Sequence, residues 1–464
     1  MNFTPADARP GRVVVFDIGK TNLKLSLLDD DGTPLSEARR ANRAVQSGLY
    51  PHFDVDAIWD WLLHELRQLR EPDRIGSIIT TTHGATVALL EDERLALPVL
   101  DYEFSGVNEI DAAYASLRDD FGCTYSPALP CGLNVGRQLF WQSRTFPEAF
   151  SRVRRILPYP QYWAWRLAGV AAGEITSWGC HTDLWDIERG RLAPMVGKLG
   201  WQALFPPLRE AGATLGTLLP EVAERTGLPA QCRVVCGIHD SNASLVKHLY
   251  GLPAPQAPLN VISSGTWALV AGVGAPLSVL DARRDMLANL DAWGRPVACA
   301  RFMGGREFAA LNAQQADNCD WQDVAALVAR GTLALPGFAP LGGGWPERRG
   351  EIRGPRPASP EQSYALASLY TALVTDDCLT RLASSGDIVI EGAFTANRHY
   401  AALLAALRPE QAVWVSDDRS GTTGGAYLLA ARPLRYEPPR ARALPRPLAG
   451  LPEYVNRWRE SVGA

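Results

Sequence analysis

A short polar loop near the N-terminus joins two predicted strands directly, with no helix after it. Residues 12–16 are β-branched or aromatic apart from Arg12, and apolar residues alternate with polar ones from Leu23 to Leu27, so each stretch predicts a strand. In Rossmann and Walker-type units the glycine-rich turn opens a helix, and this loop leads into a strand instead. The sequence therefore predicts an antiparallel strand pair and argues against both units.

The same order of strand, small polar turn and strand recurs near the midpoint, over residues 259–273. Further strands are predicted at residues 75–80, 234–236, 388–391 and 413–416. Helices are predicted at residues 55–69, 147–169, 242–249, 400–407, 421–431 and 453–459, and extended surface chain at residues 432–447. The 41 glycines and 34 prolines are too many for a helix bundle and are typical of a loop-rich α/β protein.

The repeated opening predicts two domains, residues 1–250 and residues 251–464, divided by a stretch that contains Pro253 and Pro255. A net charge of −4 gives no overall basicity for binding nucleic acid or an anionic membrane. No apolar run approaches the roughly 18 residues of a membrane span, and residues 1–12 lack the apolar core of a signal peptide. We therefore expect a cytoplasmic protein with eight reduced cysteines, and a homodimer as the default assembly.

The first loop carries groups that suit a phosphate and a metal ion. Its candidate phosphate ligands are Gly19, Thr21, Asn22 and Lys24. Lys20 adds further positive charge, and Asp17 at the end of the first strand can hold Mg²⁺ through water. A plain β-hairpin with a polar turn uses the same residue types, so this loop alone leaves both interpretations open.

Two turns in the second half offer similar chemistry without charge. Gly265 and Thr266 form the midpoint turn, and Gly392 follows the strand at residues 388–391. Close backbone approach at Gly392 would admit adenine or ribose, which Asn397 could bind. Ordinary turns are the alternative for both. If both halves present a phosphate loop, the two loops would clamp one nucleotide in a cleft between them.

Asp240 follows the predicted strand at residues 234–236, at the sheet edge where open α/β sheets bind ligands. Its carboxylate could take a proton from a substrate hydroxyl during phosphoryl transfer, or it could cap the helix that follows. The neighbouring His239 could touch substrate or serve packing. Zinc at Cys232, Cys236 and His239 is disfavoured, because the two cysteines flank a strand and no second pair lies nearby.

His83 and Gly84 follow the strand at residues 75–80, where a neutral imidazole could bind sugar hydroxyls. A buried, hydrogen-bonded structural histidine is the alternative. Asp101 and Tyr102 add polar groups near aromatic residues.

Taken in order, these residues resemble the motifs of the FGGY family of carbohydrate kinases, within the actin and hexokinase superfamily. The resemblance runs from Val13 to about Ala431. Residues 17–24 and 264–266 are similar to the two phosphate motifs, and residues 391–397 to the adenosine motif. Gly237 and Asp240 resemble the catalytic motif, and residues 83–84 the pair that touches the sugar. The resemblance implies an α/β fold of two actin-like (ribonuclease H-like) domains with a ligand cleft between them.

The resemblance also implies an ATP- and Mg²⁺-dependent sugar kinase with Asp240 as general base and Asp17 as the metal ligand. Two departures stand out: residues 392–394 read Gly-Ala-Phe where the family has two or three glycines, and only Asp101 matches the family's second sugar motif. The opening motif is closest to the fuculokinase and rhamnulokinase branches, so a ketose such as L-fuculose, L-rhamnulose or xylulose is expected. A non-catalytic sugar or nucleotide sensor and an actin-like ATPase remain the alternatives.

Overall fold

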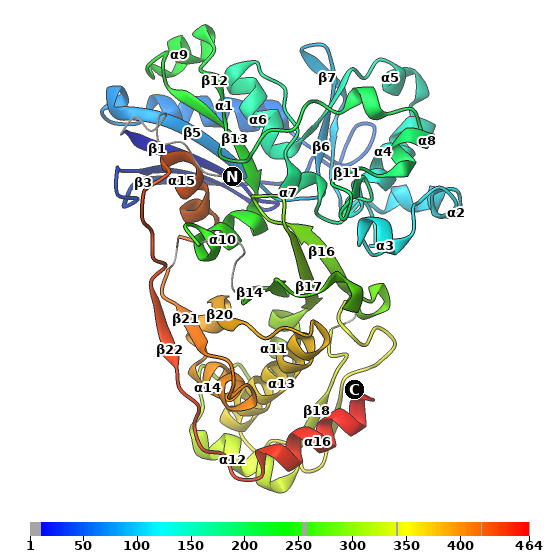
Figure 1. The fold of residues 1–464 in the computed structure, drawn as a ribbon, viewed down its shortest axis with the longest axis vertical. Helices are drawn as coiled ribbons and strands as arrows, with labels where there is room; N and C mark the ends of the chain where they lie inside the picture. The colour runs from blue at the N-terminus through cyan, green and yellow to red at the C-terminus, as the bar shows by residue number, and fades with distance from the viewer. Residues whose placement is uncertain (1–10, 253–257, 340–341, 419, 464) are drawn as a thin grey trace. The chain divides into compact units, whose positions relative to one another are not determined.

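The computed structural model describes residues 11–252, 258–339, 342–418 and 420–463 (Figure 1). The interpretation of residues 1–10 as free of a signal peptide, and the dividing prolines Pro253 and Pro255, lie outside the described residues. Two compact units are present. The first comprises Met1–Leu252, Asn289–Arg295 and Ser420–Tyr436, and the second comprises Pro253–Ala288, Pro296–Arg419 and Glu437–Ala464. The division at residue 250 stays a prediction.

The first unit is built on a six-stranded sheet with the order β12-β13-β5-β1-β2-β3. These strands are β12 (Thr214–Thr217), β13 (Arg233–His239), β5 (Ile75–Thr82), β1 (Arg12–Ile18), β2 (Asn22–Leu28) and β3 (Pro34–Ala41). Strand β1 pairs antiparallel with β2, as the opening sequence predicted, and parallel with β5, which is itself parallel to β13. The carboxyl ends of β1, β5 and β13 therefore lie at one edge of the sheet.

Both faces of this sheet are covered by helices, which explains the continuous apolar run in β1. Successive side chains of a strand point to opposite faces. Val14 and Phe16 pack in the core formed with α1 (Val55–Arg67) and α6 (Tyr159–Ala168). Val13 and Val15 pack in a second core with α10 (Asp240–Leu249) and α15 (Thr422–Ala431). Figure 1 shows α15, coloured near the red end of the scale, beside the blue strands of the N-terminus.

The helix predicted over residues 147–169 is wrong in its central part. The structure has α5 (Pro147–Ser151), then β9 (Arg155–Pro158), then α6. Strand β9 pairs antiparallel with β6 (Val87–Glu91), so a tertiary partner decides its conformation. Proline at position 158 also disfavours the helical conformation at Leu157.

The second unit repeats the local arrangement of the first. Its sheet has the order β16-β17-β15-β14-β20-β21-β22. The strands are β16 (Met286–Leu290), β17 (Pro296–Phe302), β15 (Ala268–Val273), β14 (Leu259–Ser264), β20 (Asp387–Gly392), β21 (Val413–Ser416) and β22 (Arg440–Ala443). Strand β14 pairs antiparallel with β15 and parallel with β20, as β1 does with β2 and β5. The recurrence predicted from the sequence is confirmed, while β22 lies in the segment predicted to be extended surface chain.

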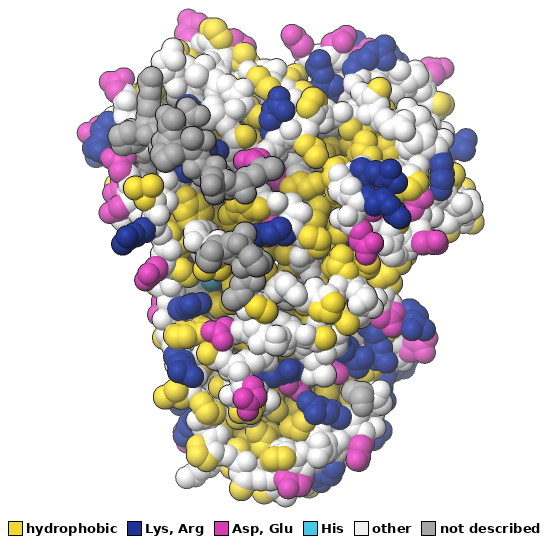
Figure 2. Space-filling view, viewed as in Figure 1, with side chains coloured by type: hydrophobic (Ala, Val, Ile, Leu, Met, Phe, Trp, Pro, Cys, Tyr) yellow, Lys and Arg dark blue, Asp and Glu magenta, His cyan; other side chains and the backbone are white. Residues whose placement is uncertain are grey.

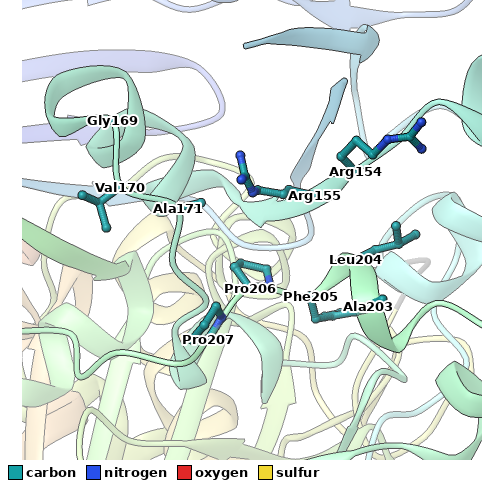
Figure 3. Close-up of a pocket in the computed structure, with 10 residues that line it drawn as sticks. All are labelled: Arg154, Arg155, Gly169, Val170, Ala171, Ala203, Leu204, Phe205, Pro206 and Pro207. Atoms are coloured by element: carbon teal, nitrogen blue, oxygen red, sulfur yellow. The ribbon is translucent and has the colours of Figure 1, made fainter. Parts of the chain in front are cut away.

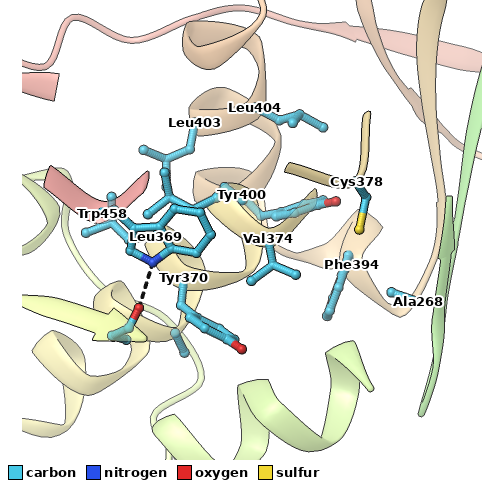
Figure 4. Close-up of a cluster of buried hydrophobic side chains, with 14 of the residues drawn as sticks. Ala268, Leu369, Tyr370, Val374, Cys378, Phe394, Tyr400, Leu403, Leu404 and Trp458 are labelled. Atoms are coloured by element: carbon cyan, nitrogen blue, oxygen red, sulfur yellow. Dashed lines mark hydrogen bonds between the residues drawn. The ribbon is translucent and has the colours of Figure 1, made fainter. Parts of the chain in front are cut away.

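The core of the second unit surrounds α13 (Pro360–Arg381), which is buried along most of its length. Side chains from α14 (Arg398–Leu407) and α16 (Leu451–Val462) pack against it, as Figure 4 shows for Tyr400, Leu403 and Trp458. The indole N–H of Trp458 donates to the Ala334 carbonyl at 2.8 Å, so the buried ring leaves no donor unpaired. Among the described residues, no helix has the length and hydropathy needed to cross a bilayer.

Candidate active site

Three parallel strands bring predicted site residues to one edge of the first sheet. Ile18, Thr82 and His239 lie level with one another at the ends of β1, β5 and β13. Asp17, His83 and Asp240 are their immediate neighbours in the sequence. The His83 N–H donates to the Ile18 carbonyl at 3.0 Å and ties the segment after β5 to β1. The fold therefore places residues that are up to 223 positions apart in one cluster.

Asp17 lies opposite Lys24 in the β1–β2 pair, with 3.5 Å between the Lys24 Nζ and its Oδ2. The Thr422 hydroxyl, from the start of α15, donates to the same oxygen at 2.5 Å. Burial raises the pKa of Asp17, the charge of Asp240 raises it further, and Lys24 and Thr422 oppose the rise. Thr422 was not predicted, because 405 residues separate it from Asp17 and no local pattern links the two.

The donor set at Asp17 fits magnesium better than zinc. Within the part of the chain that the structure describes, no group of three or more His, Cys, Asp or Glu side chains is arranged so that it could hold a metal ion. Mg²⁺ in nucleotide sites keeps several waters and uses one or two carboxylates together with substrate phosphates. A single carboxylate beside a lysine and a hydroxyl meets that requirement, whereas a structural zinc site needs four protein ligands.

The turn between β1 and β2 is tightly held from the backbone. The Gly19 N–H donates to the Asn22 carbonyl at 2.9 Å, and the Asn42 side chain donates to the Gly19 carbonyl at 2.8 Å. Both polar groups of Gly19 are thus used within the fold. The side chains of Thr21 and Asn22 are exposed and hydrogen-bonded to each other at 3.1 Å. Their contact with phosphate stays a prediction.

The side chain of Lys20 pairs with Asp101. Its ammonium forms an ion pair with the buried Asp101 carboxylate and lies 3.5 Å from Glu103 Oε2. The ammonium also lies over the rings of Tyr102 and Phe53, 4.8 and 5.2 Å from their centroids. Lys20 and Asp101 therefore form one donor–acceptor unit, which the sequence did not predict because 81 residues separate the partners.

His83 presents a buried nitrogen without a hydrogen-bond partner. Its Nδ1 lies 3.1 Å from the Gly84 carbonyl oxygen and 3.3 Å from the Thr86 hydroxyl. Because the carbonyl can only accept a hydrogen bond, this contact favours the tautomer with the proton on Nδ1. Burial lowers the pKa of His83 to about 4, so the ring is neutral near pH 7. Within the described structure, no group pairs with Nε2. A buried lone pair of this kind calls for an external hydrogen-bond donor.

Gly84 and His239 are in direct contact. A Cβ atom on Gly84 would lie 2.5 Å from His239 Nε2, so only glycine fits beside this ring. The Asn242 amide contacts His239 Nδ1 at 3.1 Å, and His239 Nε2 lies 3.2 Å from Asp240 Oδ1. Burial lowers the pKa of His239 to about 4. The neutral His239 ring thus packs against Gly84 on one side and lies beside the Asp240 carboxylate.

Asp240 is the first residue of α10, and its side chain is 28% exposed. The carboxylate accepts the Ser241 N–H at 2.6 Å and the Ser241 hydroxyl at 3.2 Å. His239 is the N-cap and makes no side-chain cap bond, so the alternative interpretation, that Asp240 caps this helix, is wrong. Burial raises the pKa of Asp240, and nearby His83 opposes the rise. A partly exposed carboxylate without a cap bond remains available to a substrate.

In the second unit, Ser264 joins the two turns predicted to hold nucleotide. Its hydroxyl donates to the Glu391 carbonyl at 2.5 Å and accepts the Phe394 N–H at 2.8 Å. Gly392 has φ of +78°, and a Cβ there would lie 2.1 Å from the Ser264 carbonyl oxygen. Gly265 and Thr266 are exposed in the turn after Ser264.

The buried Asn397 side chain is engaged inside the second unit. Its Oδ1 accepts the N–H groups of His399 and Tyr400 at 3.1 and 3.0 Å, and its Nδ2 donates to Ser368 at 2.9 Å. Asn397 is thus the N-cap of α14. Its predicted contact with adenosine stays a prediction.

A separate hollow of about 490 Å³ lies in the first unit (Figure 3). Its lining residues are Arg154, Arg155, Gly169, Val170, Ala171, Ala203, Leu204, Phe205, Pro206 and Pro207. None of them is a predicted site residue. Figure 3 shows the Arg154 and Arg155 side chains directed apart, so they do not form a paired anion clamp.

The repeated sheets, each with its polar turn at the strand ends, define an actin-like α/β protein. The family model "FGGY family of carbohydrate kinases, N-terminal domain" matches residues 113–246, and "Carbohydrate kinase FGGY, C-terminal domain" matches residues 256–438. A carbohydrate kinase structure from Novosphingobium aromaticivorans is 38% identical, with a TM-score of 0.90 over 98% of this chain and 99% of that one. The chain belongs to the FGGY family of carbohydrate kinases, a family of phosphotransferases, and the predicted resemblance is confirmed.

More distant relatives agree with this assignment. An L-fuculokinase from Salmonella typhi is 28% identical over 270 residues, which are 56% of each chain. This chain thus matches about half the length of such curated relatives. A ligand-bound xylulose kinase from Lactobacillus acidophilus is 16% identical, with a TM-score of 0.77 over 97% of this chain and 96% of that one. At that identity the likeness shows the shared fold alone.

Proposed function

We propose that this protein transfers the γ-phosphoryl group of ATP to a hydroxyl of a neutral sugar. The observation that carries the proposal is the buried, unpartnered Nε2 of His83 at the strand edge that also carries Asp240. Its lone pair can accept a hydrogen bond from a sugar hydroxyl. Names of relatives, L-fuculokinase and L-xylulose kinase among them, support a ketose such as L-fuculose or xylulose. The opening motif keeps L-rhamnulose as a further candidate.

The first unit would bind the sugar through complementary groups. His83 Nε2 and the Asp101 carboxylate can accept hydrogen bonds from sugar hydroxyls, and the Lys20 ammonium can donate one to a sugar oxygen. Adjacent hydroxyls of the sugar can therefore each find a partner. Gly84 lets the His239 ring approach, and that ring packs beside Asp240. His83 and His239 are both neutral near pH 7. Lys20 and Lys24 each lie beside a carboxylate. This balance suits a neutral polyol better than a sugar acid.

Asp240 would act as the general base. Its partly exposed carboxylate takes the proton from the attacking sugar hydroxyl as the oxygen approaches the γ-phosphorus. Asp17 would hold Mg²⁺, which neutralises phosphate charge when bound. Lys24, Thr21, Asn22 and Gly19 would face the phosphates from the first unit. The exposed residues Gly265, Thr266 and Gly392 of the second unit would face the nucleotide. Asn397 would contribute to the same nucleotide site from the buried start of α14.

Two alternatives set the design of the test. A sugar or nucleotide sensor would bind without turnover, and an actin-like ATPase would hydrolyse ATP without sugar. The findings favour neither of them, because the family is one of phosphotransferases. A homodimer and a cytoplasmic location stay predictions.

The experiment is a coupled ADP-release assay with ATP and Mg²⁺ across L-fuculose, L-rhamnulose, D-xylulose, L-xylulose, gluconate and glycerol. We expect release that depends on a ketose and stays at background with gluconate. Tight sugar binding without turnover would support the sensor, and release without any sugar would support the ATPase. Either outcome would refute the proposal.

A further inference from the structure

Strand β13 carries a bulge just before Asp240. Val235 pairs with Ile79 and Ile238 pairs with Thr81, so two residues of β13, Cys236 and Gly237, oppose Thr80 alone. Gly237 has φ of +91°, and a Cβ there would lie 2.5 Å from the Thr80 carbonyl oxygen. Bulges bend a strand and re-aim the side chains that follow. This bulge therefore sets the direction in which the chain leaves the sheet toward Asp240.

Gln161, a completely buried residue of α6, holds the bulge from one side. Its Nε2 lies 3.1 Å from the Cys236 carbonyl oxygen and 3.1 Å from the Gly237 carbonyl oxygen. An amide NH₂ group carries two hydrogens, so it can donate one to each carbonyl. The side chain thus satisfies both bulged residues at once.

A second pair of residues holds the backbone one step closer to Asp240. The His239 N–H donates to the Thr176 hydroxyl at 3.2 Å, and that hydroxyl donates to Glu174 Oε2 at 2.6 Å. Both residues are fully buried at the start of α7 (Ile175–Trp178), where Glu174 is the N-cap. Because the Thr176 hydroxyl donates its hydrogen bond to Glu174, its oxygen has a lone pair left to accept the His239 N–H.

We propose that Gln161, Glu174 and Thr176 are positioning residues that hold the bulged end of β13 and thereby aim the Asp240 carboxylate. This inference rests on the proposed function, because it assumes that Asp240 is the base. Two helices converge on three backbone groups within four residues of β13. A displacement of the reacting group by about 1 Å costs on the order of 10²-fold in rate.

The test is a matched pair at Thr176, assayed with the panel sugar that gives the highest wild-type turnover. Thr176→Val removes the hydroxyl at nearly constant volume, and Thr176→Ser restores it. Thr375→Val is the control, because it removes an equally buried hydroxyl from α13 in the second unit. Gln161→Met provides an independent variant should Thr176→Val fail to fold. The readouts are kcat, the KM values for sugar and ATP, and the urea midpoint.

We expect Thr176→Val and Gln161→Met to lower kcat at least about tenfold while both KM values stay within about twofold. Thr176→Ser should recover most of the loss, and Thr375→Val should lower the urea midpoint without changing kcat. Unchanged kcat in both test variants, or equal losses in Thr176→Val and Thr176→Ser, would overturn the inference. Asp240→Asn separates the two claims. Full turnover by that variant, or no turnover by the wild type, overturns the proposed function and this inference with it.

Discussion

The His83 ring is fixed by its neighbours, so its free nitrogen has one chemical role. The Gly84 carbonyl accepts a hydrogen bond from the Nδ1–H, and burial keeps the ring neutral, which leaves Nε2 as a hydrogen-bond acceptor. Phe53 and Tyr102 pack against the ring, with centroids 5.1 and 5.5 Å away, and hold its orientation. A substrate hydroxyl that donates to this nitrogen would find it already oriented.

Replacing His83 by phenylalanine keeps the size of the side chain and removes the acceptor. A hydrogen bond of about 1.4 kcal/mol corresponds to a tenfold change in binding. We expect His83→Phe to raise the KM for the sugar about tenfold with little change in the KM for ATP. Steady-state kinetics with either substrate varied will measure both values. Equal sugar KM values in variant and wild type would remove His83 from the sugar site.

Glu174 gives a prediction about stability and pH. Burial raises its pKa from 4.5 to about 7, so the folded protein binds more protons than the unfolded chain between these values. The contribution of Glu174 to the free energy of unfolding therefore falls as pH rises through this window, by about 3 kcal/mol. The groups that face the Glu174 carboxylate are Thr176, Ser177 and the Cys236 thiol, and Arg209 lies near that thiol.

Glu174→Gln removes this titration and isolates its effect. We expect the unfolding free energy of the wild type, minus that of the variant, to decrease between pH 4.5 and pH 8. Urea unfolding at a series of pH values will measure the difference. A difference that does not change with pH would show that Glu174 does not titrate in this window.

At the candidate site, the sequence predicts contacts between residues that are close in the chain and misses contacts between distant ones. Lys24 lies opposite Asp17 because the two are related by a hairpin, and local spacing can predict such a contact. Thr422 reaches the same carboxylate across 405 residues, so only the folded chain reveals it. Lys20 was expected to add charge near phosphate, and its side chain instead pairs with Asp101.

At the scale of elements, the pairing of β14 with β20 depends on Gly392. Its positive φ and the 2.1 Å that would separate a Cβ from the Ser264 carbonyl exclude other residues. We expect Gly392→Ala to lower the free energy of unfolding by about 2–4 kcal/mol. Gly274→Ala is the matched control, because Gly274 has φ of +81° and ordinary contact distances, and strain alone costs about 1 kcal/mol.

Urea unfolding of both glycine variants decides this point. Equal losses in the two would mean that backbone strain accounts for the whole effect and that the close approach of β14 and β20 at Gly392 is not needed.

The elements that sequence patterns predicted well are those with a clear local period. The two hairpins and the helix at α1 follow alternating or helical apolar spacing, and the structure contains them. The predicted helix over residues 147–169 fails because β9 is selected by its partner β6, and β22 was missed because it pairs with β21. Pairing partners far away in the chain carry no local signal.

At the scale of the molecule, the first unit depends on α15, a helix that comes late in the sequence. Helix α15 shares a core with α10 and covers one face of β1 and β5. Tyr427 on α15 also donates to the Asp30 carbonyl at 2.9 Å. A chain that ends at residue 252 would therefore leave this apolar face open to water.

We expect residues 1–252 alone to unfold without a cooperative transition. Attaching residues 420–436 through a flexible linker should restore cooperativity, because α15 would again cover the sheet. Circular dichroism during urea titration will compare the two chains. A cooperative transition of equal midpoint in both would show that the first unit does not need α15.

Charge is distributed over the molecule without a dominant sign. Basic and acidic side chains are interspersed on the face shown in Figure 2, in keeping with the net charge of −4. We therefore expect an anionic nucleotide to be bound by local groups such as Lys24 and the polar turns, because the net charge of the molecule gives no strong positive potential.

The central claim is that Asp240 removes the proton from the sugar hydroxyl, and the Asp240→Asn variant tests it most directly. The amide keeps the shape of the side chain and cannot accept the proton, and a general base contributes about 10²–10⁴-fold to the rate. We predict that kcat for sugar-dependent ADP release falls by at least about 10²-fold while the dissociation constant of ATP stays within about threefold. Turnover close to that of the wild type would contradict the account.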